Sequence, residues 1–219
     1  VREALREAMA EEMRRDSTVF IIGEDVAGGA GAPGEEDAWG GVLGVTKGLY
    51  HQFPGRVLDA GASTGGFTQV LLERGARCVH AVDVGHDQLV PELREDPRVV
   101  VHEGLNLRDL TLDHLGGEPV DLVVGDVSFI SLRLLLQPML TVLKPSGTAL
   151  LLVKPQFEVG RGGHDSRGVV RDDAVRRRCV DDVVAGACEL GWREAWRGVS
   201  GTPGTSGNIE YFVQLVHHE

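Results

Sequence analysis

The stretch that decides the fold is LDAGASTGGF, residues 58–67. It reads as the end of a buried strand, a tight turn of small residues and the start of a helix. Gly61, Gly65 and Gly66 let the backbone approach a ligand closely, and a helix N-terminus offers free amides at that point. Asp83 ends the next predicted strand, where an acidic residue commonly binds ribose hydroxyls. Together they predict a nucleoside-binding site at one edge of an open α/β sheet.

Two common nucleotide-binding motifs do not match this loop. A dinucleotide fingerprint needs G-x-G-x-x-G, but the order from Gly61 is G-A-S-T-G-G. A P-loop ends in Gly-Lys-Ser/Thr, but Phe67 follows Gly66. A nucleoside cofactor without a pyrophosphate, such as S-adenosylmethionine, needs only the close backbone approach and the ribose acid. The alternative is that the glycines merely permit the helix to pack on the strand.

Strands and helices alternate from Arg56 onward, and several strands are continuous apolar runs. Such runs are typical of a sheet covered on both faces, and repeated strand–helix–strand units imply a parallel, doubly wound sheet. The last two strands are joined by a polar loop, so we predict an antiparallel pair at the sheet edge. This is the α/β layout of Rossmann-like methyltransferases, a seven-stranded, mostly parallel sheet with an antiparallel edge strand. The predicted strands are residues 57–60, 78–84, 98–103, 120–126, 148–154, 194–200 and 209–216, and the predicted helices are 66–74, 86–94, 131–143 and 172–190.

Residues 1–55 are predicted to be a separate segment. Apolar side chains from Val1 to Met13 recur at four-residue spacing, which predicts a helix with one apolar face. A short strand and the glycine-rich stretch 28–44, typical of a linker, follow it. We therefore expect a short N-terminal helix–strand segment with its linker at 1–55 and the methyltransferase-like domain at 56–219.

Composition and charge argue against several classes of protein. The 219 residues are 42% hydrophobic and 25% charged, which supports a buried core. No apolar run approaches the roughly 20 residues of a membrane helix, and the charged N-terminus does not read as a secretory signal. Three cysteines without CxxC spacing favour a reducing cytoplasm over a disulfide or zinc framework. With a net charge of −11, any RNA contact must rest on a local basic patch, and the best candidate is residues 161–178, with six arginines.

Three polar residues terminate or interrupt apolar segments at the same predicted edge of the sheet. Asp126 ends one predicted strand, Lys154 ends another, and Glu210 lies at the start of the last. A lysine beside an apolar core is costly unless carboxylates surround it. The three therefore predict a charged catalytic cluster, without a metal, next to the glycine loop. For each residue alone, the alternative is a solvated strand end.

Long stretches of the same region resemble the hemolysin-A type (TlyA) RNA methyltransferases of the FtsJ-like group. The resemblance implies S-adenosylmethionine-dependent 2′-O-methylation of ribose in ribosomal RNA, with ribosomal RNA or ribosomal subunits as partners. It implies a Lys-Asp-Lys-Glu catalytic set, whose last three members match Asp126, Lys154 as the base, and Glu210. The matching stretches are GRVLDAGASTGGFTQVLLERGA, VHAVDVGHDQL, VDLVVGDVSFISL, LLLVKPQFEVGRG, GVVRD and GNIEYF.

The same resemblance outlines the binding residues. We expect the arginine-rich stretch to contact RNA through Arg161, Arg167 and Arg171, and Asn106 to lie against the adenine of the cofactor. The full set expected to hold the cofactor is Gly61, Ser63, Thr64, Gly65, Gly66, Phe67, Asp83, Val84, Asn106 and Asp126.

Residues 1–55 resemble a different family, the N-terminus of the beta subunit of pyruvate-dehydrogenase-type thiamine diphosphate enzymes. The resemblance rests on VREALREAMAEEMRRDSTVFIIGEDVA and GGVLGVTKGLYHQF. The chain thus reads as a join of two families, and the S4-like RNA-binding module of the methyltransferase family has no match. Lys47 is the one lysine upstream of the glycine loop, and it either completes the catalytic set or is a surface lysine.

Two other functions follow from these gaps. One is a methyltransferase-like domain that binds the cofactor but is inactive on RNA, because its RNA-binding module and first catalytic lysine are replaced. The other, remote, is a membrane-active hemolysin, which no apolar or amphipathic membrane segment supports.

Overall fold

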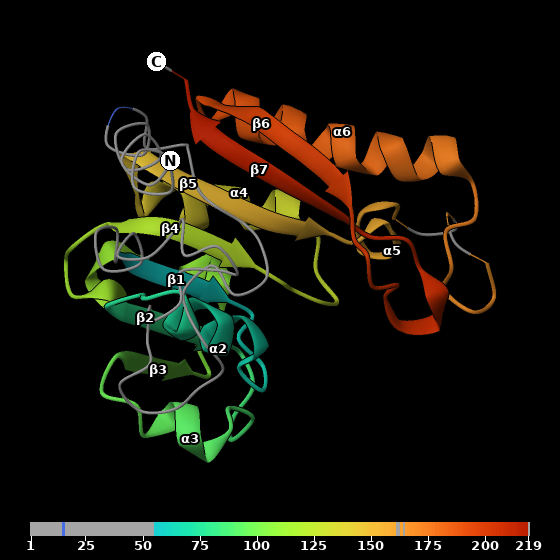
Figure 1. Ribbon diagram of the computed structural model, residues 1–219. Coiled ribbons are helices and arrows are strands. Elements are labelled where there is room, and N and C mark those ends of the chain that lie inside the picture. Colours follow the sequence, from blue (N-terminus) through green and yellow to red (C-terminus); the bar gives the residue numbers. More distant parts are fainter. Residues whose placement is uncertain (1–14, 16–54, 161–162, 164, 219) are drawn as a thin grey trace, which may run out of the picture.

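The computed structural model describes residues 15, 55–160, 163 and 165–218, which form a single sheet flanked by helices (Figure 1). The predicted helix, strand and linker of residues 1–55 lie outside the described residues, apart from positions 15 and 55. The strands are β1 (Arg56–Ala60), β2 (Cys78–Asp83), β3 (Val99–Glu103), β4 (Val120–Gly125), β5 (Leu143–Val153), β6 (Trp192–Val199) and β7 (Tyr211–His217). The α-helices are α2 (Gly66–Glu73), α3 (Pro91–Arg94), α4 (Leu136–Thr141), α5 (Pro155–Glu158) and α6 (Asp173–Glu189). The 3-10 helices are η2 (Leu107–Asp109), η3 (Leu112–Leu115), η4 (Leu132–Leu134) and η5 (Thr205–Gly207).

The seven strands lie in the order β3-β2-β1-β4-β5-β7-β6. Strands β1 to β5 pair in parallel, and β7 runs antiparallel between β5 and β6. The predicted antiparallel pair at the sheet edge is confirmed, with β6 outermost. The strand order reverses between β1 and β4, and open α/β sheets bind ligands at the carboxyl ends of strands beside such a reversal.

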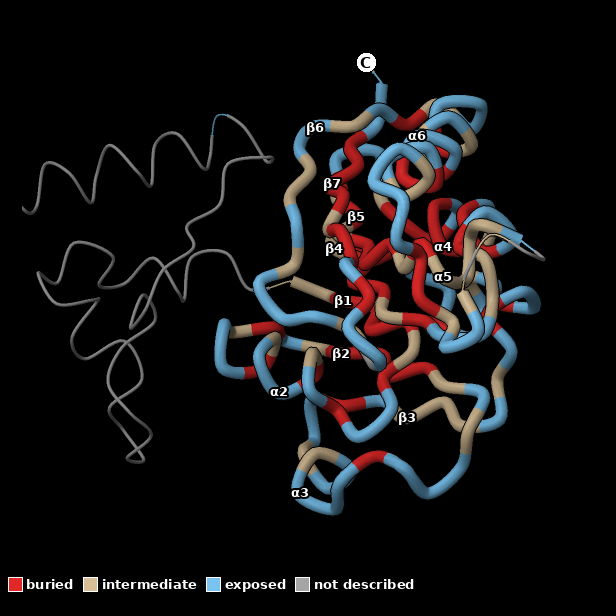
Figure 2. Tube along the Cα trace, turned by 90° about the vertical axis from the view of Figure 1, so that its right-hand side faces the viewer, coloured by how far each residue is buried: buried red, intermediate tan, exposed pale blue. Residues whose placement is uncertain are grey.

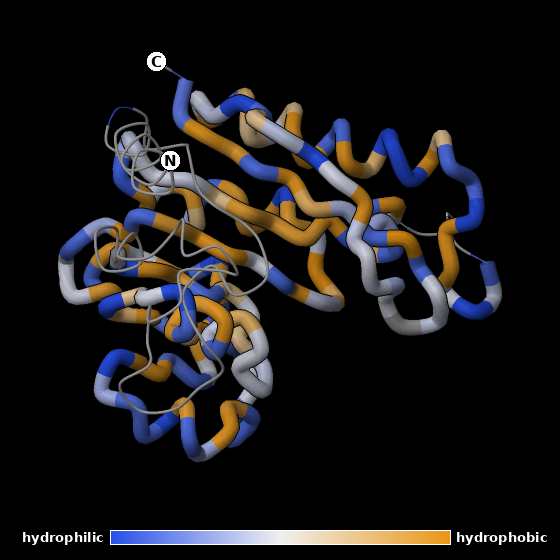
Figure 3. The backbone as a smooth tube through the Cα atoms, in the orientation of Figure 1, coloured by the Kyte–Doolittle hydropathy of each residue, from blue (hydrophilic) through white to orange (hydrophobic). Residues whose placement is uncertain are grey.

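Helices cover both faces of the sheet, as the apolar strands predicted (Figure 2). Helices α4 and α6 lie over one face, where the larger core joins Val180 and Val183 of α6 to Leu151 and Leu215 of the sheet. Helix α2 lies over the other face, where a smaller core forms around Val79. Figure 3 shows the hydrophobic residues gathered along the central strands. None of the described helices is long and apolar enough to cross a membrane.

The predicted helix at 86–94 was wrong over its first half. Residues 86–90 are not helical, and only Pro91–Arg94 forms a helix. Proline disfavours helical geometry in the residue before it, and Val90 is extended with φ −61° and ψ 147°. Proline at the first helical position is favourable, so α3 begins at Pro91. Asp87, with φ 55°, also turns the chain away from a right-handed helix.

A cluster of polar side chains around the buried His80 lies near the amino ends of β1 and β2. His80 is 4% exposed, and its Nε2 lies 3.1 Å from Nη2 of Arg56 and 3.5 Å from Sγ of Cys78. Its Nδ1 lies 3.1 Å from Nε2 of His102. Burial, with the neighbouring His102 and Arg56, lowers the pKa of His80 to about 4. The folded state therefore holds this imidazole neutral.

We expect His80 to make the fold sensitive to acid. Its pKa is about 4 in the folded chain against 6.5 for a free histidine, so the unfolded chain binds more protons between these values. The free energy of unfolding should therefore fall as the pH drops from about 6.5 to about 4, by up to about 3 kcal/mol from this residue. His80→Gln should flatten that part of the profile, measured by urea unfolding at a series of pH values.

Asp59→Asn provides a control of opposite sign. Burial raises the pKa of Asp59 from 3.8 to about 6, so its proton uptake stabilises the fold as the pH falls through that range. In Asp59→Asn, the free energy of unfolding should therefore fall more steeply with decreasing pH than in the wild type. A His80→Gln profile with the wild-type slope would contradict the assignment.

Candidate active site

The glycine loop leaves β1 by a turn that excludes side chains. Gly61 has φ 87°, and a Cβ there would lie 2.3 Å from the backbone oxygen of Asp126. The amides of Gly61 and Ala62 both donate to the carbonyl of Val82, at 2.9 and 3.1 Å. These bonds hold the loop against the end of β2. By contrast, a Cβ at Gly66 would meet nothing within 4 Å, so the first turn of α2 opens to free space.

Asp83 is held by the backbone on both sides. Its Oδ2 accepts a hydrogen bond from the amide of Ser63 at 2.9 Å, and its Oδ1 accepts one from the amide of Gly85 at 2.8 Å. Each carboxylate oxygen keeps a further lone pair for another donor. The carboxylate is thus fixed beside the glycine loop and can accept two more hydrogen bonds, while its role as a ribose acid stays a prediction.

Asp59 is a buried carboxyl that the sequence reasoning missed. It is fully buried in β1, and its Oδ2 accepts a hydrogen bond from Oγ1 of Thr68 in α2 at 2.6 Å. Its Oδ1 is buried with no hydrogen-bond partner among the described residues. Burial, and to a smaller extent Asp126 and Asp83, raise its pKa to about 6 against the effect of Thr68. The available signal was an aspartate inside an apolar strand, just before the glycines.

Asp126 and Lys154 form an ion pair at the carboxyl ends of adjacent strands. The parallel register of β4 and β5 pairs Gly125 with Leu151, and each polar residue follows its strand. Nζ of Lys154 lies 2.5 Å from Oδ1 of Asp126 and donates to Oγ of Ser128 at 3.0 Å. The lysine side chain is only 13% exposed. The structure thus brings together two predicted residues and adds Ser128, which the sequence reasoning missed.

Glu210 lies at the same edge, but its described partner is not the lysine. It is 6% exposed and precedes β7, whose first residue, Tyr211, pairs with Val153. Its Oε1 accepts a hydrogen bond from Nε2 of Gln156 at 2.8 Å. The sequence predicted a charged cluster of Asp126, Lys154 and Glu210, and the hydrogen bond of Glu210 goes to Gln156 instead of to the other two. Gln156 belongs to α5, which begins directly after Lys154, so the helix carries the contact.

Three further predicted cofactor residues, Phe67, Val84 and Asn106, come after the carboxyl ends of β1, β2 and β3. The ring of Phe67 lies 6.4 Å from that of Phe212, edge on, and Val84 is 67% exposed. Oδ1 of Asn106 accepts the amide of Arg108 at 3.0 Å and so caps η2. Lys47 lies outside the described residues. Within the described part of the chain, no group of three or more His, Cys, Asp or Glu residues is placed to hold a metal ion.

A groove with two aromatic rings is lined by residues that follow Asp126 and Lys154 closely in the sequence, including Phe129 and Gln156. Its volume is about 410 Å³. Phe129 is 91% exposed and has φ 64°, and its ring centroid lies 5.2 Å from that of Phe157. Sequence reasoning missed Phe129, although it follows Asp126 by only three positions. The groove is lined by Arg108, Phe129, Ile130, Ser131, Leu134, Gln156, Phe157 and Gly160.

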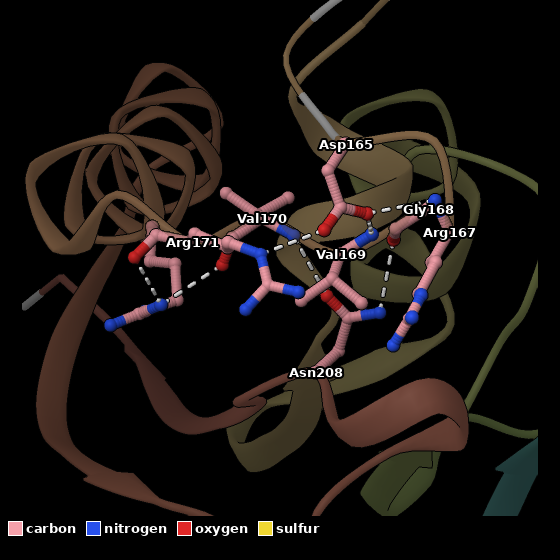
Figure 4. Close-up of polar contacts among 8 residues, drawn as sticks. Asp165, Arg167, Gly168, Val169, Val170, Arg171 and Asn208 are labelled. Carbon is pink, nitrogen blue, oxygen red and sulfur yellow. Dashed lines mark hydrogen bonds and ion pairs between the residues drawn. The ribbon is translucent and has the colours of Figure 1, made fainter.

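The arginine-rich stretch is organised by one carboxylate (Figure 4). Asp165 accepts the amides of Arg167 and Val169, both at 2.9 Å, and Nε of Arg171 at 2.7 Å. These bonds lower the pKa of Asp165 to about 2. Of the predicted RNA contacts, Arg167 is exposed, Arg171 is exposed but already paired, and Arg161 lies outside the described residues.

Comparison with known proteins matches two families along the chain. Residues 45–216 match the family model described as FtsJ-like methyltransferase. Residues 1–68 match the transketolase pyrimidine-binding domain. In that region, the chain is 59% identical over 59 residues to the beta subunit of acetoin:2,6-dichlorophenolindophenol oxidoreductase of Cupriavidus necator, covering 27% of this chain and 18% of that subunit. The predicted join of two families is therefore confirmed.

The larger region has close curated and solved relatives. The chain is 53% identical over 160 residues to the 16S/23S rRNA (cytidine-2′-O)-methyltransferase TlyA of Mycobacterium tuberculosis, covering 73% of this chain and 59% of that protein. It is 40% identical over 159 residues to hemolysin A of Brachyspira hyodysenteriae, covering 73% and 66%. The chain thus spans less than two thirds of the length of these relatives. A solved hemolysin-like protein of Streptococcus thermophilus aligns with a TM-score of 0.73 and 37% identity, over 78% of this chain and 63% of that one.

Proposed function

The chain belongs to the FtsJ-like methyltransferase family, and from that premise we propose that it methylates the 2′-hydroxyl of a ribose in ribosomal RNA. The observation that carries the proposal is the Lys154–Asp126 ion pair at the strand ends beside the glycine loop. The relative from M. tuberculosis, a cytidine-2′-O-methyltransferase of ribosomal RNA, supports the substrate class. Such a substrate places the protein, in this proposal, in the cytoplasm.

The residues of the loop fit S-adenosylmethionine, the cofactor of the proposed reaction. When bound, it supplies an activated methyl group on a positively charged sulfur. Asp83 would accept the ribose hydroxyls, because the amides of Ser63 and Gly85 already fix both of its oxygens. The open space at Gly66 leaves room for a ligand at the start of α2. We propose that the remaining loop residues, together with Phe67, Val84, Asn106 and Asp126, complete the cofactor site.

Lys154 is the proposed base. Methyl transfer needs the ribose oxygen in line with the methyl group, so positioning supplies much of the rate. Lys154, held by Asp126 and Ser128 at 2.5 and 3.0 Å, is an ammonium while it is ion-paired, so its amine would first release a proton to water. The neutral Nζ would then take the proton of the 2′-hydroxyl. Glu210, bonded to Gln156 of the helix that follows Lys154, would be the third member of the catalytic set. No step of this scheme requires a metal.

The groove of Phe129 and Phe157 is the proposed entry for the acceptor nucleotide. Exposed aromatic rings bind single-stranded nucleic acid by stacking on its bases. Arg108 at the groove and the exposed Arg167 would contact phosphates, with Arg161 and Arg171 as further proposed contacts. The acidic chain would thus bind RNA through a local cationic surface.

One observation favours a second function. The family match begins at residue 45, and the preceding residues match a thiamine-enzyme domain instead. The chain would then bind S-adenosylmethionine without methylating RNA, because part of its relatives' length is replaced. Calorimetric titration with S-adenosylmethionine tests what the two functions share. We expect saturable binding, and none with NAD, whose fingerprint motif is absent. A lack of binding would overturn both functions.

Phe129→Ala is expected to weaken RNA binding specifically. Losing one base–aromatic stack costs about 1–3 kcal/mol, so the KM for ribosomal subunits should rise about tenfold or more. The affinity for S-adenosylmethionine should stay unchanged. Trp196→Ala is the matched control, since Trp196 is 52% exposed on β6 and does not line the groove. Equal KM values for the two variants would remove Phe129 from the RNA site.

A further inference from the structure

Asn208 joins two segments that are far apart in the sequence. Its side chain is 3% exposed, and its Oδ1 accepts a hydrogen bond from the amide of Val170 at 3.1 Å. Its Nδ2 donates to the carbonyl of Gly168, also at 3.1 Å (Figure 4). Both ends of the amide thus bind the backbone of the arginine turn, which we define as residues 165–171. A buried amide bonded at both ends fixes its partners, since breaking either bond leaves a buried polar group unsatisfied.

The backbone of Asn208 is tied in turn to the segment that carries Glu210. The carbonyl of Asn208 accepts the amide of Gly204 at 2.9 Å, and the carbonyl of Glu210 accepts the amide of Ser200 at 2.8 Å. A Cβ on Gly204 would lie 2.1 Å from Oε1 of Glu210, so this loop packs directly on the carboxylate. Asn208 therefore sits between the proposed catalytic edge and the arginine turn.

The arginine turn also has internal order of its own. Asp165 accepts the amides of Arg167 and Val169, and the amide of Gly168 donates to the carbonyl of Asp165 at 2.9 Å. Arg176 of α6 donates to the carbonyls of Val170 and Arg171, both at 2.9 Å. The turn is therefore a preformed unit, and Asn208 fixes that unit relative to Glu210.

We propose that Asn208 is a positioning residue for RNA capture, holding the arginine turn at a fixed place beside Glu210. This inference rests on the proposed function. With the turn fixed, Arg167 contacts an RNA phosphate while the acceptor ribose lies at Lys154. The order is present before RNA binds, so the RNA does not have to organise the turn. Asn208 itself touches neither the cofactor nor the reacting atoms in this account.

Kinetics with isolated ribosomal subunits separate positioning from simple loss of stability. Asn208→Ala should raise the KM for subunits about tenfold, because both hydrogen bonds to the turn are lost. Its affinity for S-adenosylmethionine should stay at the wild-type value. Asn208→Asp keeps the size of the side chain but loses the donor to Gly168, so its KM for subunits should rise less than that of Asn208→Ala. Gln214→Ala, a buried amide in the middle of β7, controls for general destabilisation and should leave the KM unchanged.

Combining substitutions tests whether Asn208 acts through the arginine. If Asn208 positions Arg167, the double variant Asn208→Ala/Arg167→Ala should have a KM close to that of the worse single variant. Multiplied effects in the double variant, or an unchanged KM in Asn208→Ala, would overturn the proposal.

Limited trypsin digestion supplies a readout that does not depend on methylation. Cleavage after Arg167 or Arg171 should be about tenfold faster in Asn208→Ala than in wild type and Gln214→Ala, because the turn opens more often. Wild-type cleavage rates in Asn208→Ala would overturn the proposal even if methylation is observed. A wild type that binds S-adenosylmethionine but neither binds nor methylates subunits would overturn the proposed function and the RNA role of Asn208. Faster cleavage of Asn208→Ala would then show that Asn208 only stabilises the arginine turn.

Discussion

Lys154→Ala is expected to lower the rate of methyl transfer by about 10²- to 10⁴-fold, the usual contribution of a positioned general base. The affinity for S-adenosylmethionine should change little, because the glycine loop and Asp83 belong to β1 and β2 whereas Lys154 follows β5. The loss should therefore appear in the chemical step. Single-turnover transfer from labelled S-adenosylmethionine to ribosomal subunits, beside a calorimetric Kd, measures the two effects separately.

Lys144→Ala is the matched control for this variant. Lys144 forms an ion pair with Asp121 at 2.5 Å, the same distance as the pair of Lys154 with Asp126, but its side chain is 39% exposed. Its loss should cost about 1 kcal/mol of stability or less and leave the transfer rate unchanged. Lys154→Ala should cost more stability, since it leaves Asp126 without its cation in a less exposed place. Equal transfer rates in the two variants would exclude Lys154 as the base.

Asp83→Ala is expected to weaken S-adenosylmethionine binding by about 1.5–3 kcal/mol, or about 10- to 150-fold in Kd. The substitution removes the proposed acceptor for ribose hydroxyls and also releases the amides of Ser63 and Gly85, which should loosen the glycine loop. Calorimetric titration gives the Kd, and thermal unfolding without ligand confirms that the variant is folded.

Asp96→Ala controls for the loss of a carboxylate that accepts a nearby amide. Asp96 accepts the amide of Arg98 at 2.8 Å, just as Asp83 accepts the amide of Gly85 two positions later at 2.8 Å. It precedes the amino end of β3, whereas the glycine loop follows the carboxyl end of β1, so the two lie at opposite ends of the parallel strands. Its Kd should match that of the wild type. A folded Asp83→Ala protein with the same Kd would remove Asp83 from the ribose role.

Sequence predicted the sheet well because its strands are governed by local patterns. The run ALLLV is apolar at every position, which indicates a strand buried on both faces, and it lies within β5. The sequence also predicted the tight turn at Gly61, and the structure shows why a glycine is needed there, since its conformation leaves no room for a side chain. The placing of Asp83, Asp126 and Lys154 at one edge followed from strand direction, since parallel strands end on the same side. Glu210 reaches the same edge because it precedes β7, which runs antiparallel to β5.

The partners of these residues could not be predicted in the same way, because they depend on contacts across the fold. Gln156 and Glu210 are 54 residues apart, and their hydrogen bond exists only because β7 runs antiparallel to β5. Asn208 and Gly168 meet across 40 residues. The exposure of a side chain cannot be predicted from a sequence pattern either. Phenylalanine is usually a core residue, yet Phe129 is 91% exposed and has a strained backbone with a positive φ. Each missed residue depends on tertiary structure.

The most direct test of the account is the chemical identity of the product. Wild-type protein should transfer labelled methyl groups from S-adenosylmethionine to isolated 30S or 50S ribosomal subunits. Digestion of the labelled RNA to nucleosides should place the label on a ribose 2′-oxygen, and Lys154→Ala should give none above background. Label on a base, or S-adenosylmethionine binding with no label in either subunit, would contradict the claim that this chain is a ribose methyltransferase of ribosomal RNA.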